Sequence, residues 1–181
     1  MKSRHFLAVV LIGVRSVAAS AAVQPSDLEY DVRAAFLLNF TRYVEWPASR
    51  KPAPFQMCVL GKSRFATRLE AAMKGEAWHE QSIVVRTVTD LGDEPSCDLM
   101  YVPAEMTDHF LANQNTLETL PILTVGEDPR FLTGDGIIRL FVQDNRVRFS
   151  INQRAASLSG LTISSRLLRL ARELIPGATA P

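Results

Sequence analysis

The sequence predicts an α/β fold: a mainly parallel, doubly wound (Rossmann-like) sheet flanked by helices, with a C-terminal antiparallel hairpin. Runs of β-branched and apolar residues alternate with segments in which apolar residues recur every three or four positions. This alternation is typical of a parallel sheet covered by helices on both faces. Two more strand-like runs near the C-terminus are separated only by Gln143-Asp144-Asn145. A short gap of turn-forming residues predicts that these two runs form a hairpin.

The N-terminal residues are expected to lie outside this fold. A short basic start precedes an apolar run from Phe6 to Val14 and a string of small residues that ends near Ala21. This order is typical of a cleaved secretory signal. The apolar run is too short for a membrane anchor, because a spanning helix needs about 20 apolar residues. We therefore expect a signal peptide over residues 1–21 and a single exported domain over 22–181, with its core at about 27–175.

Hydrophobic spacing, capping residues and turn residues predict the order of the elements within this domain. In chain order they are a helix over 27–45, a strand over 55–60, a helix over 63–74, strands over 82–88 and 98–102, a helix over 104–120, strands over 121–125, 136–142 and 146–151, and helices over 153–158 and 164–175. In the first helix, Leu28, Val32, Phe36 and Phe40 recur every four residues, which predicts its buried face. Pro47 closes that helix, because a residue before proline avoids the helical region.

The charge of the chain gives no reason to expect nucleic-acid binding. The whole chain has a net charge of +1. Loss of Lys2, Arg4 and Arg15 with the signal leaves 17 basic and 19 acidic residues, a net charge of −2. A nearly neutral domain lacks the basic surface that nucleic acids require.

The two cysteines are expected to form a disulfide. Cys58 lies in the first predicted strand and Cys97 at the start of the third. These strands are neighbours in a doubly wound sheet of order 2-1-3-4-5, and disulfides persist in exported proteins. Two separate buried thiols are the alternative, because free cysteine packs like a small hydrophobic residue.

The sequence shows no catalytic residues, metal site or cofactor motif. No serine-nucleophile motif is present, and neither His79 nor His109 has a cysteine or a second histidine at metal-ligand spacing. Gly61-Lys62-Ser63 looks like the end of a phosphate-binding loop, but Gln56 stands where that motif needs its first glycine. The adjacent carboxylates Glu127 and Asp128 are interpreted as part of a solvated loop. We therefore do not expect an enzyme.

Two surface features allow more than one interpretation. Arg166, Arg169 and Arg172 recur every three residues in the last predicted helix. They form either a solvated face or a patch that docks an acidic partner or a membrane surface. Trp46 either packs the end of the first helix against the sheet or anchors a partner.

The mature chain resembles the YfiR family of exported proteins along nearly all of its length. The matching stretches are residues 34–40, 43–47, 58–61, 97–99, 123–125, 146–152, 160–161 and 163–171, together with Phe131 and Gly134. The resemblance implies a compact periplasmic α/β domain that can dimerise, binds the periplasmic part of an inner-membrane diguanylate cyclase and holds it inactive. Ser150 departs from the family, because relatives often carry Glu there. Only one cysteine pair is present, where some relatives have two.

The leading hypothesis is therefore a periplasmic binding protein that represses a membrane diguanylate cyclase, without inserting into the membrane itself. The residues expected to contact the partner are Trp46, Arg148, Ser150, Asn152, Arg154, Leu161 and Ile163. The alternative is a periplasmic small-ligand sensor or binding module that acts on another membrane signalling protein. Its ligand would bind at the carboxyl ends of the strands, near Gly61, Pro103 and Gly126.

Overall fold

The computed structural model describes residues 26–50, 54–92 and 97–177. The expected signal peptide over 1–21 lies outside these residues. Among the helices of the described segments, none is long and apolar enough to cross a membrane.

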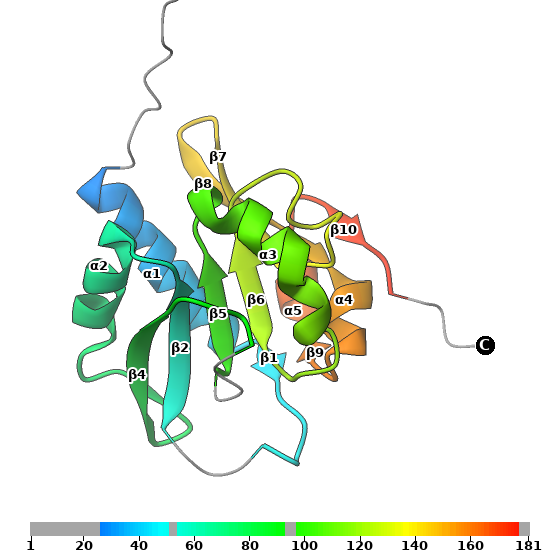
Figure 1. The fold of residues 1–181 in the computed structure, drawn as a ribbon, viewed down its shortest axis with the longest axis horizontal. Helices are drawn as coiled ribbons and strands as arrows, with labels where there is room; N and C mark the ends of the chain where they lie inside the picture. Colours follow the sequence, from blue (N-terminus) through cyan, green and yellow to red (C-terminus); the bar gives the residue numbers. More distant parts are fainter. Residues whose placement is uncertain (1–25, 51–53, 93–96, 178–181) are drawn as a thin grey trace, which may run out of the picture.

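An eight-stranded sheet forms the centre of the fold (Figure 1). From one edge to the other its strands are β10 (Leu174–Ile175), β8 (Arg146–Asn152), β7 (Ile138–Gln143), β6 (Leu123–Gly126), β5 (Leu99–Val102), β2 (Phe55–Leu60), β4 (Gln81–Val88) and β3 (Ala77–Trp78). The strands from β4 to β7 run parallel, and β7 and β8 pair antiparallel. The predicted sheet and C-terminal hairpin are confirmed.

Helices cover both faces of the sheet. Helices α1 (Asp27–Thr41) and α2 (Arg64–Met73) lie on one face, and α3 (Thr107–Asn113) lies on the other (Figure 1). Alternate residues of β2 belong to two different cores: Met57 and Val59 pack on the α1 and α2 side, whereas Cys58 and Leu60 pack on the α3 side. This period of two follows from strand geometry.

Helix α1 begins as the sequence predicts and ends earlier. Ser26 accepts a hydrogen bond from the Glu29 backbone N–H, and the Glu29 carboxylate accepts one from the Ser26 N–H. This capping box satisfies two backbone donors. The predicted continuation to residue 45 is wrong: β1 (Val44–Glu45) pairs antiparallel with β9 (Thr162–Ile163) in a separate two-stranded sheet.

The predicted helix over 104–120 is broken into three short pieces. These are the 3-10 turn η1 (Ala104–Met106), helix α3 and the 3-10 turn η2 (Gln114–Thr116). The Asn113 side chain donates to the His109 carbonyl, and the Thr116 hydroxyl donates to the Asn113 carbonyl. Such side chains favour turns because they compete with the helical backbone for its hydrogen bonds.

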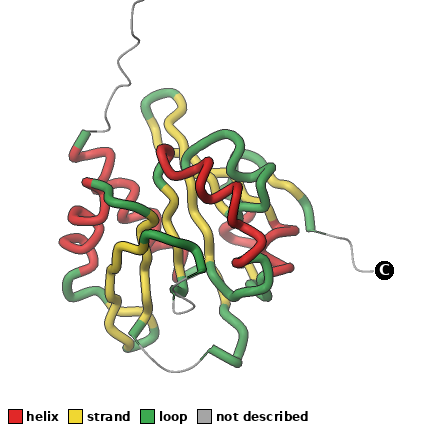
Figure 2. The backbone as a smooth tube through the Cα atoms, viewed as in Figure 1, coloured by secondary structure: helices red, strands yellow, loops and turns green. Residues whose placement is uncertain are grey.

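The predicted helix over 164–175 is also wrong beyond its first turn. Helix α4 (Gln153–Leu158) is confirmed, but α5 spans only Ser165–Leu168, and the chain then runs as loop and strand to β10 (Figure 2). The Arg172 N–H donates to the Phe149 carbonyl, and the Ile151 N–H donates to the Glu173 carbonyl. These bonds pair the segment with β8. Arg166, Arg169 and Arg172 therefore do not form one helical stripe.

Candidate partner-binding surface

Four of the residues expected to contact a partner have buried side chains. These are Ser150, Asn152, Leu161 and Ile163. A buried side chain shapes the surface above it and does not contact a partner unless the fold rearranges. Of the other three residues expected to contact the partner, Trp46 is partly buried, and Arg148 and Arg154 are exposed.

Asn152 holds two segments together. Its side-chain oxygen accepts from the Ala155 N–H at 3.0 Å and caps α4, and its amide nitrogen donates to the Leu132 carbonyl at 3.1 Å. The polar side chain is therefore satisfied inside the fold. A position between a strand and a helix is typical of an N-cap, and this signal could have predicted the structural role.

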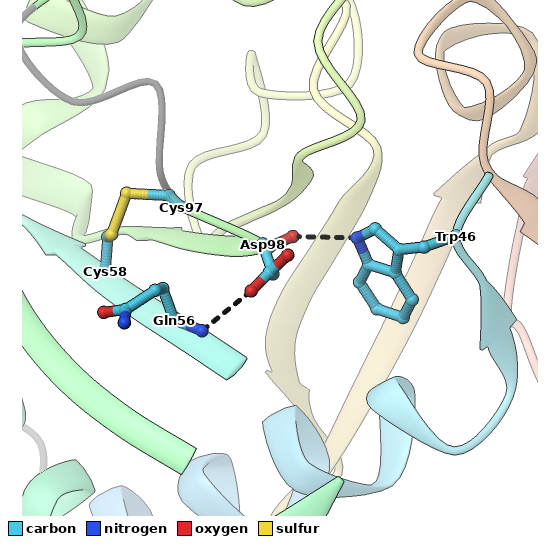
Figure 3. Close-up of a disulfide and its surroundings, with 5 residues drawn as sticks. All are labelled: Trp46, Gln56, Cys58, Cys97 and Asp98. Carbon is cyan, nitrogen blue, oxygen red and sulfur yellow. Dashed lines mark hydrogen bonds between the residues drawn. A yellow bond between two sulfur atoms is a disulfide. The ribbon is translucent and has the colours of Figure 1, made fainter. Parts of the chain in front are cut away.

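Trp46 is partly buried and packs against the core on the α1 and α2 side, and its indole nitrogen points toward Asp98 (Figure 3). Its ring lies edge-on to Phe55 and Trp78, with centroid distances of 5.1 and 5.5 Å. Its Nε1 donates to the Asp98 carbonyl at 3.3 Å. The structure therefore supports the packing interpretation of Trp46 over that of an exposed anchor.

Cys58 and Cys97 form the expected disulfide (Figure 3). Their Cα atoms lie 5.9 Å apart, within the range that the bond requires. The β2–β5 register places Cys58 beside Met100 of β5. Asp98 follows Cys97 in the chain, and its carboxylate accepts a hydrogen bond from the Gln56 N–H at 2.8 Å. The same carboxylate accepts from the Arg50 Nε at 2.5 Å and from the Arg50 Nη2 at 2.9 Å. These bonds tie the start of β5 to β2 and to the segment that precedes it.

Arg148 and Arg154 lie at the surface on different elements. Arg148 is exposed on β8 of the hairpin, and Arg154 is exposed on α4, where its Nη1 lies 3.5 Å from Asp135. Arg146 is exposed on the same strand as Arg148. The hairpin therefore carries two arginines on the exposed end of β8.

An apolar groove between α1 and the hairpin is the surface that sequence reasoning missed. It has a volume of about 450 Å³ and is bordered by Arg146. Its apolar lining consists of Leu28, Val32, Phe36, Val142 and Val147, which we call the α1–hairpin groove. Leu28 is 73% exposed and Val142 is 48% exposed. An exposed apolar patch with a polar rim is typical of an interaction site.

Helix α1 has two apolar faces, and for this reason the sequence did not predict the α1–hairpin groove. The spacing of Leu28, Val32, Phe36 and Phe40 predicts the buried face of the helix. The residues that α1 buries are Tyr30, Arg33, Ala34, Leu37, Phe40 and Thr41. Only Phe40 belongs to both sets. The predicted face is therefore wrong in its N-terminal half, where apolar side chains border a groove.

A second, larger pocket lies at the carboxyl ends of the parallel strands. It has a volume of about 900 Å³, and its lining includes Ser63 after β2, Pro103 and Glu105 after β5, and Glu127 after β6. Doubly wound sheets place ligands at this edge. The pocket lies where the sequence places a ligand for a sensor, so the geometry keeps that alternative open.

The pocket contains a buried ion-pair cluster. Arg33 lies 3.0 Å from Glu29 and 3.1 Å from Glu127, and its side chain is 8% exposed. The Arg33 Nη1 is close to Glu127 but makes no aligned hydrogen bond. The Tyr101 hydroxyl donates to the Glu127 carboxylate. Burial raises the pKa of Glu127 above its usual range, although Arg33 acts in the opposite direction. The interpretation of Glu127 as a solvated loop residue is therefore wrong.

No metal centre is evident in the described segments: no group of three or more His, Cys, Asp or Glu side chains there lies close enough to hold an ion. His109 has one carboxylate nearby, with its Nε2 3.7 Å from Asp90.

The fold is an open α/β sheet that carries an apolar groove and a polar pocket. The chain belongs to the YfiR/HmsC-like family, whose model matches residues 30–172. The resemblance drawn from the sequence is confirmed. Members of this family are periplasmic, and membership suggests a regulator of diguanylate cyclase signalling.

A solved structure shows a similar fold. It is the crystal structure of a conserved domain protein from Vibrio cholerae O1 biovar eltor, with a TM-score of 0.53 and 12% sequence identity. The match covers 80% of this chain and 60% of that chain. At this identity the likeness concerns the fold alone.

Proposed function

We propose that the protein represses an inner-membrane diguanylate cyclase by binding its periplasmic domain, and so lowers cyclic di-GMP signalling. Family membership supports this function, and the exposed apolar α1–hairpin groove is the observation that carries it. Repression follows if the protein binds the inactive conformation of the cyclase more tightly than the active one, because binding then shifts the population.

The groove defines the chemistry of the contact. Leu28 and Val142 offer apolar area, Arg146 and Glu29 are the charged residues of the groove lining, and Arg148 adds positive charge elsewhere on the hairpin. The matching surface on the cyclase is an apolar ridge flanked by carboxylates. Charge complementarity of this kind raises the association rate and selects the partner.

Substitutions in the groove test the proposal. Val142→Asp in the groove and Arg146→Glu at its rim are each expected to weaken retention of the cyclase at least about tenfold, a loss of about 1.4 kcal/mol. The measurement is a pull-down from a membrane extract with the mature protein tagged at its C-terminus, followed by quantitative mass spectrometry. Leu158→Asp is the matched control, because Leu158 is 45% exposed and lies on α4, outside the groove.

Two results would count against the proposal. The first is the recovery of no membrane protein with a cyclase domain in mild detergent. The second is equal loss of the cyclase with Leu158→Asp and Val142→Asp, since a general loss of stability would then explain both.

A second candidate function is the sensing of a small ligand in the pocket at the carboxyl edge. The pocket favours a cationic ligand, because four carboxylates face one arginine. The charged lining residues are Glu29, Arg33, Glu105, Glu127 and Asp128. A diamine would approach the carboxylates and leave the Arg33–Glu127 pair in place.

Thermal unfolding distinguishes this candidate. Putrescine at millimolar concentration is expected to raise Tm, because a ligand that binds only the folded state stabilises it by mass action. Succinate, which has the same chain length and opposite charge, is expected to have no effect. Glu105→Gln should reduce the response to putrescine, and Glu118→Gln, outside the pocket, should preserve it. Equal shifts with putrescine and succinate would exclude a specific cation site.

A further inference from the structure

The outer edge of β4 is largely unpaired. β4 is eight residues long, but the antiparallel partner β3 pairs only with Gln81 and Ser82. Among the described residues, no strand pairs with the outer side of the remaining part of β4. This edge lies at the opposite end of the sheet from the β7–β8 hairpin.

The register shows which backbone groups face outward. The Val88 carbonyl accepts from the Gly61 N–H at 2.8 Å, so the backbone of Val88 points toward β2. Backbone groups alternate sides along a strand that pairs in parallel. Ile83, Val85 and Thr87 therefore direct their N–H and C=O groups away from β2, toward the open edge.

The strand has little of the usual protection of an exposed edge, since the exposed Arg86 is the one charged residue within it. Natural edge strands are shortened, bulged or interrupted by proline and lysine, because an open edge is a template for another strand. β4 contains neither proline nor lysine, and it pairs with β2 over six consecutive residues without a bulge. Its side chains are β-branched along most of its length, and Val84 is 37% exposed. The open edge is therefore fit to pair with an extended chain.

A groove beside this edge indicates which side chains a strand paired with β4 would have. It has a volume of about 870 Å³ and lies between β4 and the C-terminal half of α2. Met73, Ile83 and Val85 form an apolar floor. The charged residues of its lining are three acids and one base: Glu70, Lys74, Glu76 and Glu80. An apolar floor with an acidic rim complements an extended segment that carries both apolar and basic residues.

We propose that the β4 edge binds an extended basic segment of another protein as an added strand. Main-chain bonds to Ile83, Val85 and Thr87 supply affinity, and Glu70 and Glu80 select basic residues, as in other strand-addition sites. This second site is independent of the α1–hairpin groove. The protein can thus hold two partners, or two parts of one partner, at opposite ends of its sheet.

Hydrogen exchange on the full mature chain tests the site. The probe is a capped Lys-Val-Lys-Val-Lys-Val peptide. It is expected to slow exchange of the Ile83, Val85 and Thr87 amides about tenfold or more, while the inward amides of Val84 and Arg86 change little. A Glu-Val-Glu-Val-Glu-Val peptide should give no protection.

Variants of the protein provide the matched control. The double variant Glu70→Lys/Glu80→Lys should abolish protection by the basic peptide, whereas Glu105→Lys/Glu118→Lys, with the same charge change elsewhere, should retain it. Three outcomes would overturn the proposal: no protection of the three outward amides, equal protection by the acidic peptide, or protection without peptide that grows with protein concentration. The last outcome would show that a second copy closes the edge.

Discussion

Replacement of both Cys58 and Cys97 by alanine is expected to lower the free energy of unfolding by about 3–4 kcal/mol. The bond joins residues 39 positions apart, and its removal frees a long loop in the unfolded chain. For a domain of this size the loss corresponds to a decrease in Tm of about 10 °C. Both cysteines are buried in the core on the α3 side, so the double variant also loses some packing.

Urea unfolding measures this effect. The denaturation midpoint should fall and the m value should rise, because the unfolded chain without the bond exposes more surface. Cys58→Ala alone should be nearly as unstable as the double variant, since either change removes the same bond. A loss below about 1 kcal/mol would show that the bond constrains the unfolded chain little.

The centre of the sheet could be predicted because its signals are local. The strands β2, β5 and β6 are short, mainly apolar runs between helix and turn residues. The general order of doubly wound sheets then places β2 beside β5. That order brought Cys58 and Cys97 onto neighbouring strands, and only the register, which the sequence does not encode locally, decides whether they bond.

The C-terminal segment could not be predicted in the same way. Leu167, Leu168, Ala171, Leu174 and Ile175 have helical spacing, yet Leu174 and Ile175 pair with Ile151 and Asn152 of β8. The edge of β8 carries backbone groups that need partners, and this non-local pairing outweighs a weak local helix preference. The short strand β1 likewise depends on residues more than 100 positions away.

The binding surfaces were only partly visible in the sequence. The family motifs predicted partner contacts in the segment around Asn152, where most side chains are buried. The α1–hairpin groove was hidden because Leu28 and Val32 have the same spacing as core residues. The pocket at the carboxyl edge was placed correctly from strand order alone, but the pairing of Arg33 with Glu127 joins residues 94 positions apart and needed the fold to be known.

Removal of Arg33 is expected to destabilise the fold in a pH-dependent way. Arg33→Met should cost about 3–5 kcal/mol at neutral pH, because it leaves a buried carboxylate without its cation. The Glu127 side chain is 18% exposed. Its folded-state pKa is already raised by burial and is lowered by Arg33, so the substitution should raise the pKa further.

The sign of the pH dependence follows from proton binding. A raised pKa means that the folded chain binds the Glu127 proton more tightly than the unfolded chain. Stability is then lost as the pH rises from about 4.3, the usual pKa of Glu, through the higher pKa of the folded state. Unfolding of Arg33→Met should therefore show its largest deficit relative to the wild type above this window, and a smaller deficit below it.

The double variant Arg33→Met/Glu127→Gln separates charge from packing. Its glutamine does not ionise, so most of the neutral-pH loss should be recovered and the additional pH dependence should disappear. Chemical denaturation of the three proteins at pH 4.5 and pH 7.5 measures both effects. If Arg33→Met is equally destabilised at the two pH values, the cost arises from lost contacts with Tyr30 and Glu29 rather than from the charge of Glu127. The pocket would then tolerate the buried Glu127 carboxylate without the charge of Arg33.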